Sequence, residues 1–71
     1  MKPKPGSIIR SICPVSSFLW KTLYNDDTSG EVLSGDLMIM IDPAGDYYLV
    51  LHPSLGVGYF WADYIEVAAL V

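Results

Sequence analysis

The sequence of 71 residues contains very few of the side chains that hold small domains together by cross-linking. It has one cysteine, Cys13, and one histidine, His52. A lone thiol cannot form an internal disulfide, and a structural zinc site needs a cluster of cysteine and histidine ligands. Because a chain of this length is also too short to divide into two domains, we expect one domain that is stabilised by side-chain packing alone.

Basic residues are also scarce. The chain has four lysine and arginine residues against eight aspartate and glutamate residues, which gives a formal net charge of −4. Three of the bases, Lys2, Lys4 and Arg10, lie in the first ten residues. Nucleic-acid affinity depends on clustered lysine and arginine that release counterions from phosphates. The charge therefore argues against a nucleic-acid partner and favours a basic protein or peptide.

Long apolar segments are absent from the sequence. Runs such as residues 37–41 are far shorter than the roughly 20 residues of a membrane-spanning helix. The first residues lack the apolar segment of a signal peptide. We therefore expect a soluble, cytoplasmic protein that has no membrane partner.

Apolar residues make up 52% of the chain and aromatic residues 13%, in short segments separated by turn-forming residues. Residues 1–6 read as a proline-containing tail, and residues 61–64 fit a short helical turn. Residues 15–24 fit a helical turn nearly as well as a strand, and we expect them to be extended. Residues 31–33 are expected to form a short return arm after the turn. The other predicted strands are residues 7–13, 37–41, 47–52, 57–60 and 65–67. Short strands at this spacing predict an all-β fold, a small five-stranded barrel over residues 7–71.

Hydrophobic patterning within these strands predicts the core. The segment 37–41 is apolar at every position, so this strand can be covered on both faces. Residues 47–52 place alternate side chains on opposite faces. We expect the core to include Leu37, Ile39, Val50, Phe60 and Ile65, and we expect residues 42–46 to connect two strands as a hairpin loop closed by a glycine.

The last third of the chain resembles the end of an SH3 domain. The positions that match the family pattern in order and spacing are Gly58, Phe60, Tyr64, Ile65 and Glu66. Upstream, residues 35–37 are similar to the Gly-Asp entry into the second strand of the family, and residues 22–26 are a loose echo of its ALYDY signature. The resemblance implies an SH3-like barrel.

Two departures from the family concern ligand binding. The tryptophan that usually begins the third strand is replaced by Tyr47 or Tyr48, and the ligand-contacting proline is replaced by Trp61. Among the residues that contact polyproline ligands in the family, Tyr64 is the one retained. The resemblance therefore implies the fold more strongly than it implies recognition of a PxxP ligand.

Aromatic residues supply the candidate binding surface. Amphipathic rings are favoured at interfaces, and a barrel brings distant segments together. We predict a partner-binding patch formed by Trp61, Tyr64, Tyr48, Trp20 and Tyr24. The predicted function is a non-enzymatic protein or peptide interaction module, compatible with an adaptor, a regulator or a small viral or phage protein. The alternatives are a nucleic-acid-binding small barrel of the Sm or KOW kind and a structural subunit that self-associates through a strand edge or through residues 68–71.

Chemistry at the remaining polar residues has weaker support. Cys13 and His52 are the one candidate pair of nucleophile and base, and we expect the thiol to be buried and inert and the imidazole to be exposed. The acidic residues Asp26, Asp27, Glu31 and Asp36 lack the spacing of a calcium loop and read as solvated turn charges. We therefore predict no catalytic residues, no metal site and no cofactor.

Overall fold

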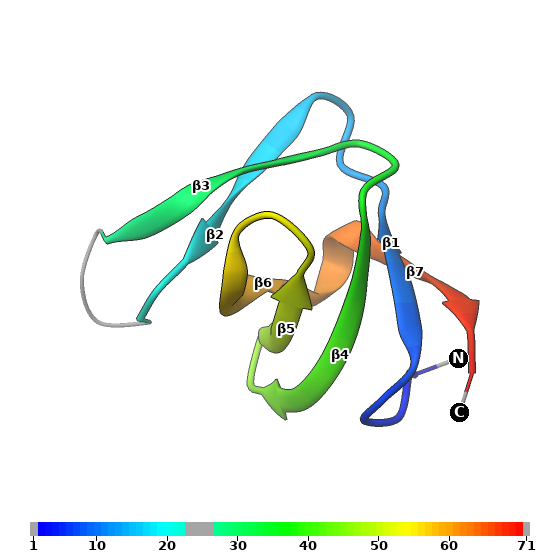
Figure 1. Ribbon diagram of the computed structural model, residues 1–71. Coiled ribbons are helices and arrows are strands. Elements are labelled where there is room, and N and C mark those ends of the chain that lie inside the picture. Colours follow the sequence, from blue (N-terminus) through cyan, green and yellow to red (C-terminus); the bar gives the residue numbers. More distant parts are fainter. Residues whose placement is uncertain (1, 23–26, 71) are drawn as a thin grey trace.

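The computed structural model describes residues 2–22 and 27–70, and it is built from β-strands (Figure 1). Its elements are β1 (Ile8–Ser11), β2 (Ser16–Trp20), β3 (Thr28–Leu33), β4 (Leu37–Ala44), β5 (Tyr47–His52), β6 (Gly56–Trp61), the 3-10 turn η1 (Ala62–Tyr64) and β7 (Ile65–Ala69). The predicted all-β class is confirmed. The part of the chain that the structure describes contains no helix that is long and apolar enough to cross a membrane.

The strands form one antiparallel sheet in the order β3-β2-β6-β5-β4-β1-β7. In the described residues no pairing joins β3 to β7, so the sheet is open and seven-stranded where the sequence predicted a five-stranded barrel. The difference comes from β2 and β3, which form an antiparallel hairpin with a register shift between Leu19 and Trp20. That hairpin meets the rest of the sheet at one residue pair, Trp20 opposite Tyr59.

Two glycines turn the chain between neighbouring strands. Gly35 has a φ of 92°, and the N–H of Asp36 donates to the carbonyl of Leu33 at 3.1 Å, as in a type II turn. Gly45 has a φ of 66° in the connection between β4 and β5. The predicted loop of residues 42–46 is shorter in the structure, because β4 continues to Ala44 through a bulge.

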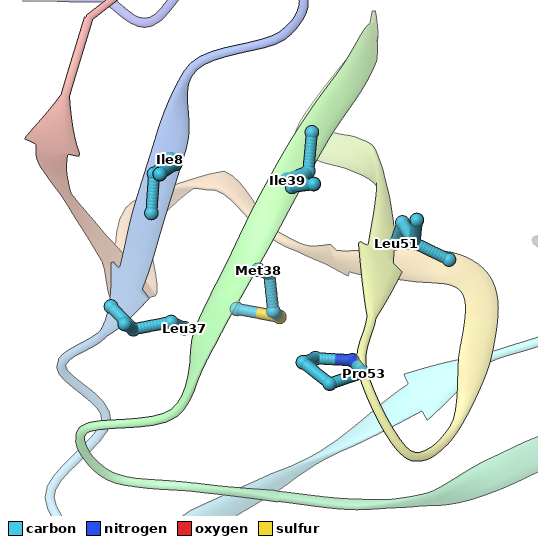
Figure 2. A pocket seen from close by; sticks show the side chains of 6 residues that line it. All are labelled: Ile8, Leu37, Met38, Ile39, Leu51 and Pro53. Carbon is cyan, nitrogen blue, oxygen red and sulfur yellow. The ribbon is translucent and has the colours of Figure 1, made fainter.

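One face of β4 points outward although its side chains are apolar. Ile8 of β1, Ile39 of β4 and Leu51 of β5 occupy paired positions and lie side by side in Figure 2. Leu51 is in turn opposite Val57 of β6. Leu37 and Pro53 adjoin these four residues. We call the six together the apolar face: Ile8, Leu37, Ile39, Leu51, Pro53 and Val57. A groove of about 330 Å³ crosses this face and is lined by five of these residues and Met38.

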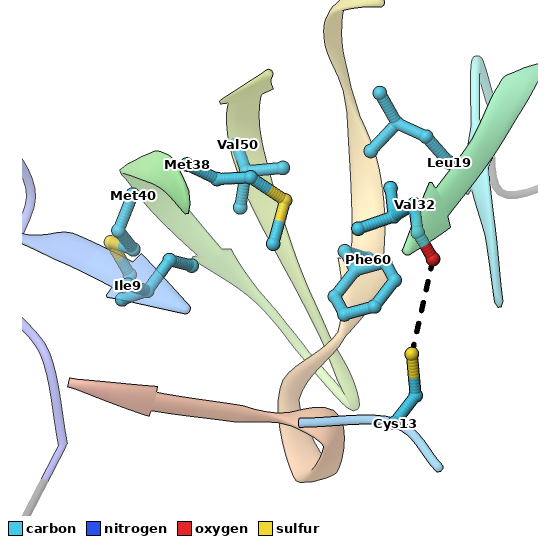
Figure 3. Close-up of a cluster of buried hydrophobic side chains, with 8 residues drawn as sticks. All are labelled: Ile9, Cys13, Leu19, Val32, Met38, Met40, Val50 and Phe60. Atoms are coloured by element: carbon cyan, nitrogen blue, oxygen red, sulfur yellow. Dashed lines mark hydrogen bonds between the residues drawn. The ribbon is translucent and has the colours of Figure 1, made fainter. Parts of the chain in front are cut away.

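The core lies on the opposite face of the same strands (Figure 3). Its side chains are at most 2% exposed: Ile9, Cys13, Leu19, Val32, Met38, Met40, Val50 and Phe60. The predicted core positions Val50 and Phe60 are confirmed, and Ile65 packs against the cluster. Leu37 and Ile39 were predicted wrongly, since they are 47% and 43% exposed. The register of β4 turns its methionines inward, which forces the alternate residues outward.

Two close backbone approaches complete the packing. A Cβ atom added to Gly58 would lie 2.6 Å from Cγ of Leu19 and 2.9 Å from the carbonyl oxygen of Trp20. Glycine at this position therefore allows β2 to cross β6, as expected for a glycine within a strand. The predicted tail also lies on the domain, because the N–H of Gly6 donates to the carbonyl of Met40 at 2.7 Å and Pro3 is buried.

Candidate functional site

A stacked pair of aromatic rings marks the end of β5 and β6 that is nearest η1. Tyr47 begins β5, Trp61 ends β6, and the two residues occupy directly paired positions. Their ring centroids are 4.4 Å apart and their planes are inclined by 30°. Residues that are directly opposite in an antiparallel pair point to the same face. The pair is therefore held by strand register, on the outer face, and both rings keep part of their surface in solvent.

Three further aromatic side chains share this outer face. Tyr59 lies two residues before Trp61 on β6, and Trp20 of β2 is directly opposite Tyr59. Phe18 packs edge-on against Trp20, with ring centroids 6.1 Å apart and an interplanar angle of 65°. We call these five residues the aromatic face: Phe18, Trp20, Tyr47, Tyr59 and Trp61. The buried indole Nε1 of Trp20 has no hydrogen-bond partner among the described residues, so packing holds this ring in place.

The structure brings some of the predicted patch together and separates other members from it. Trp61 and Trp20 share the aromatic face, with Tyr59 between them. Tyr48 points the other way and packs against the core beside Phe60. Tyr64 is 42% exposed in η1, and its carbonyl accepts a hydrogen bond from the N–H of Ile12. Tyr24 lies outside the described residues.

The sequence analysis missed Tyr47, Tyr59 and Phe18. The signal for Tyr47 was present, because Tyr48 alternates with the predicted core residue Val50 on the inner face and Tyr47 must then face outward. The same alternation on β6 places Tyr59 outside once Phe60 is inside.

Two carboxylates lie close to the stacked pair in the sequence. Asp46 precedes Tyr47, and Asp63 lies two residues after Trp61. The N–H of Ala62 donates to the carbonyl of Asp46 at 3.0 Å, which ties η1 to the β4–β5 turn. Both acids border a hollow of about 290 Å³ that is also lined by Lys2, Pro43, Gly45, Tyr48 and Ala62. None of the five rings of the aromatic face lines this hollow, and the one aromatic residue that does, Tyr48, points the other way.

Four acidic residues of the first half were predicted to be solvated turn charges. Asp27 and Glu31 are exposed, in agreement with this, and Asp26 lies outside the described residues. Asp36 is partly buried, and its Oδ2 accepts hydrogen bonds from the N–H of Leu33 at 3.1 Å and from Nε2 of His52 at 2.9 Å. The hydrogen bond from His52 is the largest cause that lowers the pKa of Asp36 below its ordinary value of 3.8.

His52 is buried, whereas the sequence analysis predicted an exposed side chain. Its Nδ1 accepts hydrogen bonds from the N–H groups of Ser54 and Leu55, at 3.1 and 3.2 Å. An Nδ1 atom that accepts cannot carry a proton, so the neutral ring carries its proton on Nε2 and donates it to Asp36. Both ring nitrogens are engaged, and the pair connects the β3–β4 turn to the β5–β6 loop.

Cys13 is buried as predicted, at 2% exposure. Its Sγ lies 3.0 Å from the hydroxyl of Ser11 and donates to the carbonyl of Val32 at 3.9 Å. Its polar neighbours are thus a hydroxyl and a carbonyl, and His52, the candidate base, is bound to Asp36 instead. Within residues 2–22 and 27–70, no group of three or more histidine, cysteine and acidic residues is placed to hold a metal ion.

Comparison with protein-family models, with curated proteins and with solved structures finds no match to this chain. The case for a function therefore depends on the two outer surfaces. One is the aromatic face at the η1 end of β5 and β6, and the other is the apolar face at the opposite end of these strands.

Proposed function

We propose that this protein is a non-enzymatic protein or peptide interaction module whose open sheet is a variant of the SH3-like barrel. The resemblance of its last third to the end of an SH3 domain supports the fold. The matching residues occupy β6, η1 and β7, where two of them have clear structural reasons. Phe60 fills the core, and Gly58 permits the crossing of β2 over β6.

The stack of Trp61 on Tyr47 is the observation that carries the proposal. The inner face of the sheet is filled by other side chains, so the outer rings are not needed to complete the core. A ring that is fixed by strand register loses little conformational freedom when a partner covers it. Partly exposed tryptophan and tyrosine residues of this kind are the usual anchors of protein interfaces.

The net charge of −4 favours a basic partner segment. Asp46 and Asp63 attract lysine or arginine, and the face of a tryptophan ring also attracts a cation. Lys2 lines the same hollow and partly offsets the two acids. We therefore expect a ligand segment with one basic side chain beside Trp61 and apolar residues that cover Tyr47 and Tyr59.

A peptide array with varied basic and apolar positions tests this function, with Kd values measured in solution for the sequences that bind. We expect Trp61→Ala to weaken binding by about 2 kcal/mol or more, or roughly 30-fold. The free energy of unfolding should fall by about 1 kcal/mol, because the ring is only partly buried. Val57→Ala is the matched control, since it truncates an outward side chain at the other end of β6. Equal binding by the parent and Trp61→Ala would contradict the proposal.

A salt titration separates this function from nucleic-acid binding by the same surface. A complex held by phosphate contacts loses affinity steeply as salt rises. A peptide complex anchored by aromatic packing and one basic side chain should lose only a few-fold. Tight binding of a single-stranded oligonucleotide with a steep salt dependence would favour the small nucleic-acid-binding barrel.

A further inference from the structure

The apolar face is a feature of the surface that the proposed function leaves unused. Five of its six side chains leave between 40% and 54% of their surface in solvent, and Pro53 is exposed as well. Together they present apolar area on the order of 500 Å², near the upper end for the largest patch on a monomeric domain. Tyr47 and Leu51 are separated by about 13 Å along β5, so this surface is distinct from the stacked aromatic pair.

Hydrogen bonding decides how an occupant can bind there. β4 is paired with β1 on one side and with β5 on the other, and β5 is paired with β6 as well. The backbone groups of these central strands are therefore already used, so an incoming peptide cannot add to them as another strand. The occupant must instead cover the face with apolar side chains, as one sheet does when it packs on another.

The two ends of the face differ in charge: an ion pair of Arg10 and Glu66 lies at one end, and the carboxylate of Asp42 lies at the other. Arg10 is directly opposite Leu37 at one end, and its Nη1 binds Glu66 at 2.7 Å. Asp42 is exposed at the other end, opposite Leu49 of β5. When two such faces meet with their β4 strands antiparallel, Asp42 of one copy approaches Arg10 of the other. A two-fold axis makes this contact twice. Because Glu66 already neutralises Arg10, the complementarity of the face to itself rests on its apolar area and not on charge.

The available area matches what a homodimer requires. An interface of standard size buries about 800 Å² on each subunit, and about 65% of a homodimer interface is apolar. The apolar face supplies about that amount of apolar surface. A small domain also gains from such burial, because its own core is limited and its single cysteine cannot form an internal disulfide.

We propose that a second copy of this chain covers the apolar face, in a two-fold symmetric dimer whose sheets pack face to face. The contact centres on Ile39 and Leu51 and leaves the strand edges of β3 and β7 outside it. Each copy carries a charge of −4, so the dimer should tighten as salt screens the repulsion between the copies.

Sedimentation velocity from about 1 µM to about 1 mM tests this proposal, a span that brackets dimers of ordinary affinity. We expect the parent to shift from monomer to dimer within this range. Ile39→Lys should weaken the dimer by about 100-fold or more, because it places a charge at the centre of an apolar contact. Val15→Lys is the matched control and should dimerise like the parent, since Val15 is 80% exposed in the connection between β1 and β2.

Circular dichroism of each variant at low concentration checks that it is folded. If Ile39→Lys is not, Leu51→Thr replaces it, because threonine suits a strand and removes apolar surface from the same face. A parent that stays monomeric up to the highest concentration would overturn the proposal. So would a dimer that folded Ile39→Lys and Leu51→Thr variants form as tightly as the parent, since another surface would then hold it together. Neither result depends on Trp61, so the proposed function is tested separately.

Discussion

The two faces of β4 carry equally apolar side chains in opposite environments. Met38 and Met40 point inward and are 1% exposed, whereas Ile39 between them points outward and is 43% exposed. The same contrast holds on β6, where Phe60 is fully buried and Val57 is 54% exposed. Hydrophobicity alone therefore does not locate the core of this sheet.

The contrast separates folding from association. The inner side chains are covered by other parts of the same chain, so their burial contributes to the free energy of folding. The outer side chains contribute little to the folding of one copy, since much of their surface remains in solvent. They become important when another molecule covers them, and mutations on the two faces should therefore affect different measurements.

The largest expected effect is a loss of folding stability, and it compares a mutation on the inner face of β6 with one on its outer face. Phe60→Ala should lower the free energy of unfolding by about 3–5 kcal/mol, because it removes a fully buried ring and leaves a cavity. Val57→Ala on the outer face of the same strand should cost about 1 kcal/mol or less. Urea denaturation of both variants at low concentration provides the comparison. Similar losses for the two variants would show that both faces are part of the folding core.

Neighbouring positions on β4 provide a second comparison with a somewhat smaller effect. Met40→Ala should cost about 2–5 kcal/mol, whereas Ile39→Ala should cost about 1 kcal/mol in the monomer. Thermal melts at two protein concentrations distinguish folding from association. The loss from Ile39→Ala should grow with concentration if the parent dimerises through this face. A loss from Ile39→Ala as large as that from Met40→Ala in dilute solution would return Ile39 to the core.

Much of the fold could be predicted because it depends on local signals. Strand β5 has the predicted bounds, and the turns at Gly35 and Gly45 follow from the preference of glycine for positive φ. The side on which the core lies could not be predicted from β4, because an entirely apolar segment has no polar side. The preference of strands for β-branched residues points to Ile39, whereas the register places the two methionines inside.

The candidate site was predictable only in part, for a similar reason. Trp61 was found through the family resemblance, but its stacking partner depends on the pairing of β5 with β6. His52 was expected to be exposed because it precedes a proline turn. Its carboxylate partner, Asp36, is sixteen residues away in the sequence. Such contacts become visible only when the sheet places distant residues together.

An intermediate loss of folding stability is expected when Gly58, on the inner face where β2 crosses β6, is replaced by alanine. Gly58 is not among the glycines with positive φ, so alanine suits its backbone conformation and the cost is steric. The added Cβ would meet the backbone oxygen of Trp20, which cannot move without shifting β2. We expect Gly58→Ala to cost about 1–3 kcal/mol and to alter Trp20 fluorescence, measured in a Trp61→Phe background. A loss below about 0.5 kcal/mol would show that β2 yields easily at this crossing.

The smallest effect concerns the polar link between Asp36 and His52, at the margin of the inner face. Because this link lowers the pKa of the Asp36 carboxyl in the folded protein, the unfolded chain takes up the proton more readily. The stabilisation is therefore fully present above about pH 5, and it is lost as the pH falls below about 4 and through the folded pKa.

Asp36→Asn keeps the size of the side chain and removes its charge. We expect the parent to be more stable than Asp36→Asn at neutral pH, with a difference that shrinks in acid. Urea titrations from about pH 7 to about pH 3 measure it, and Asp42→Asn controls for the loss of an exposed carboxylate. A difference that is as large at the acid end as at neutral pH would mean that Asp36 stabilises the turn through its shape, without a contribution from its ionised form.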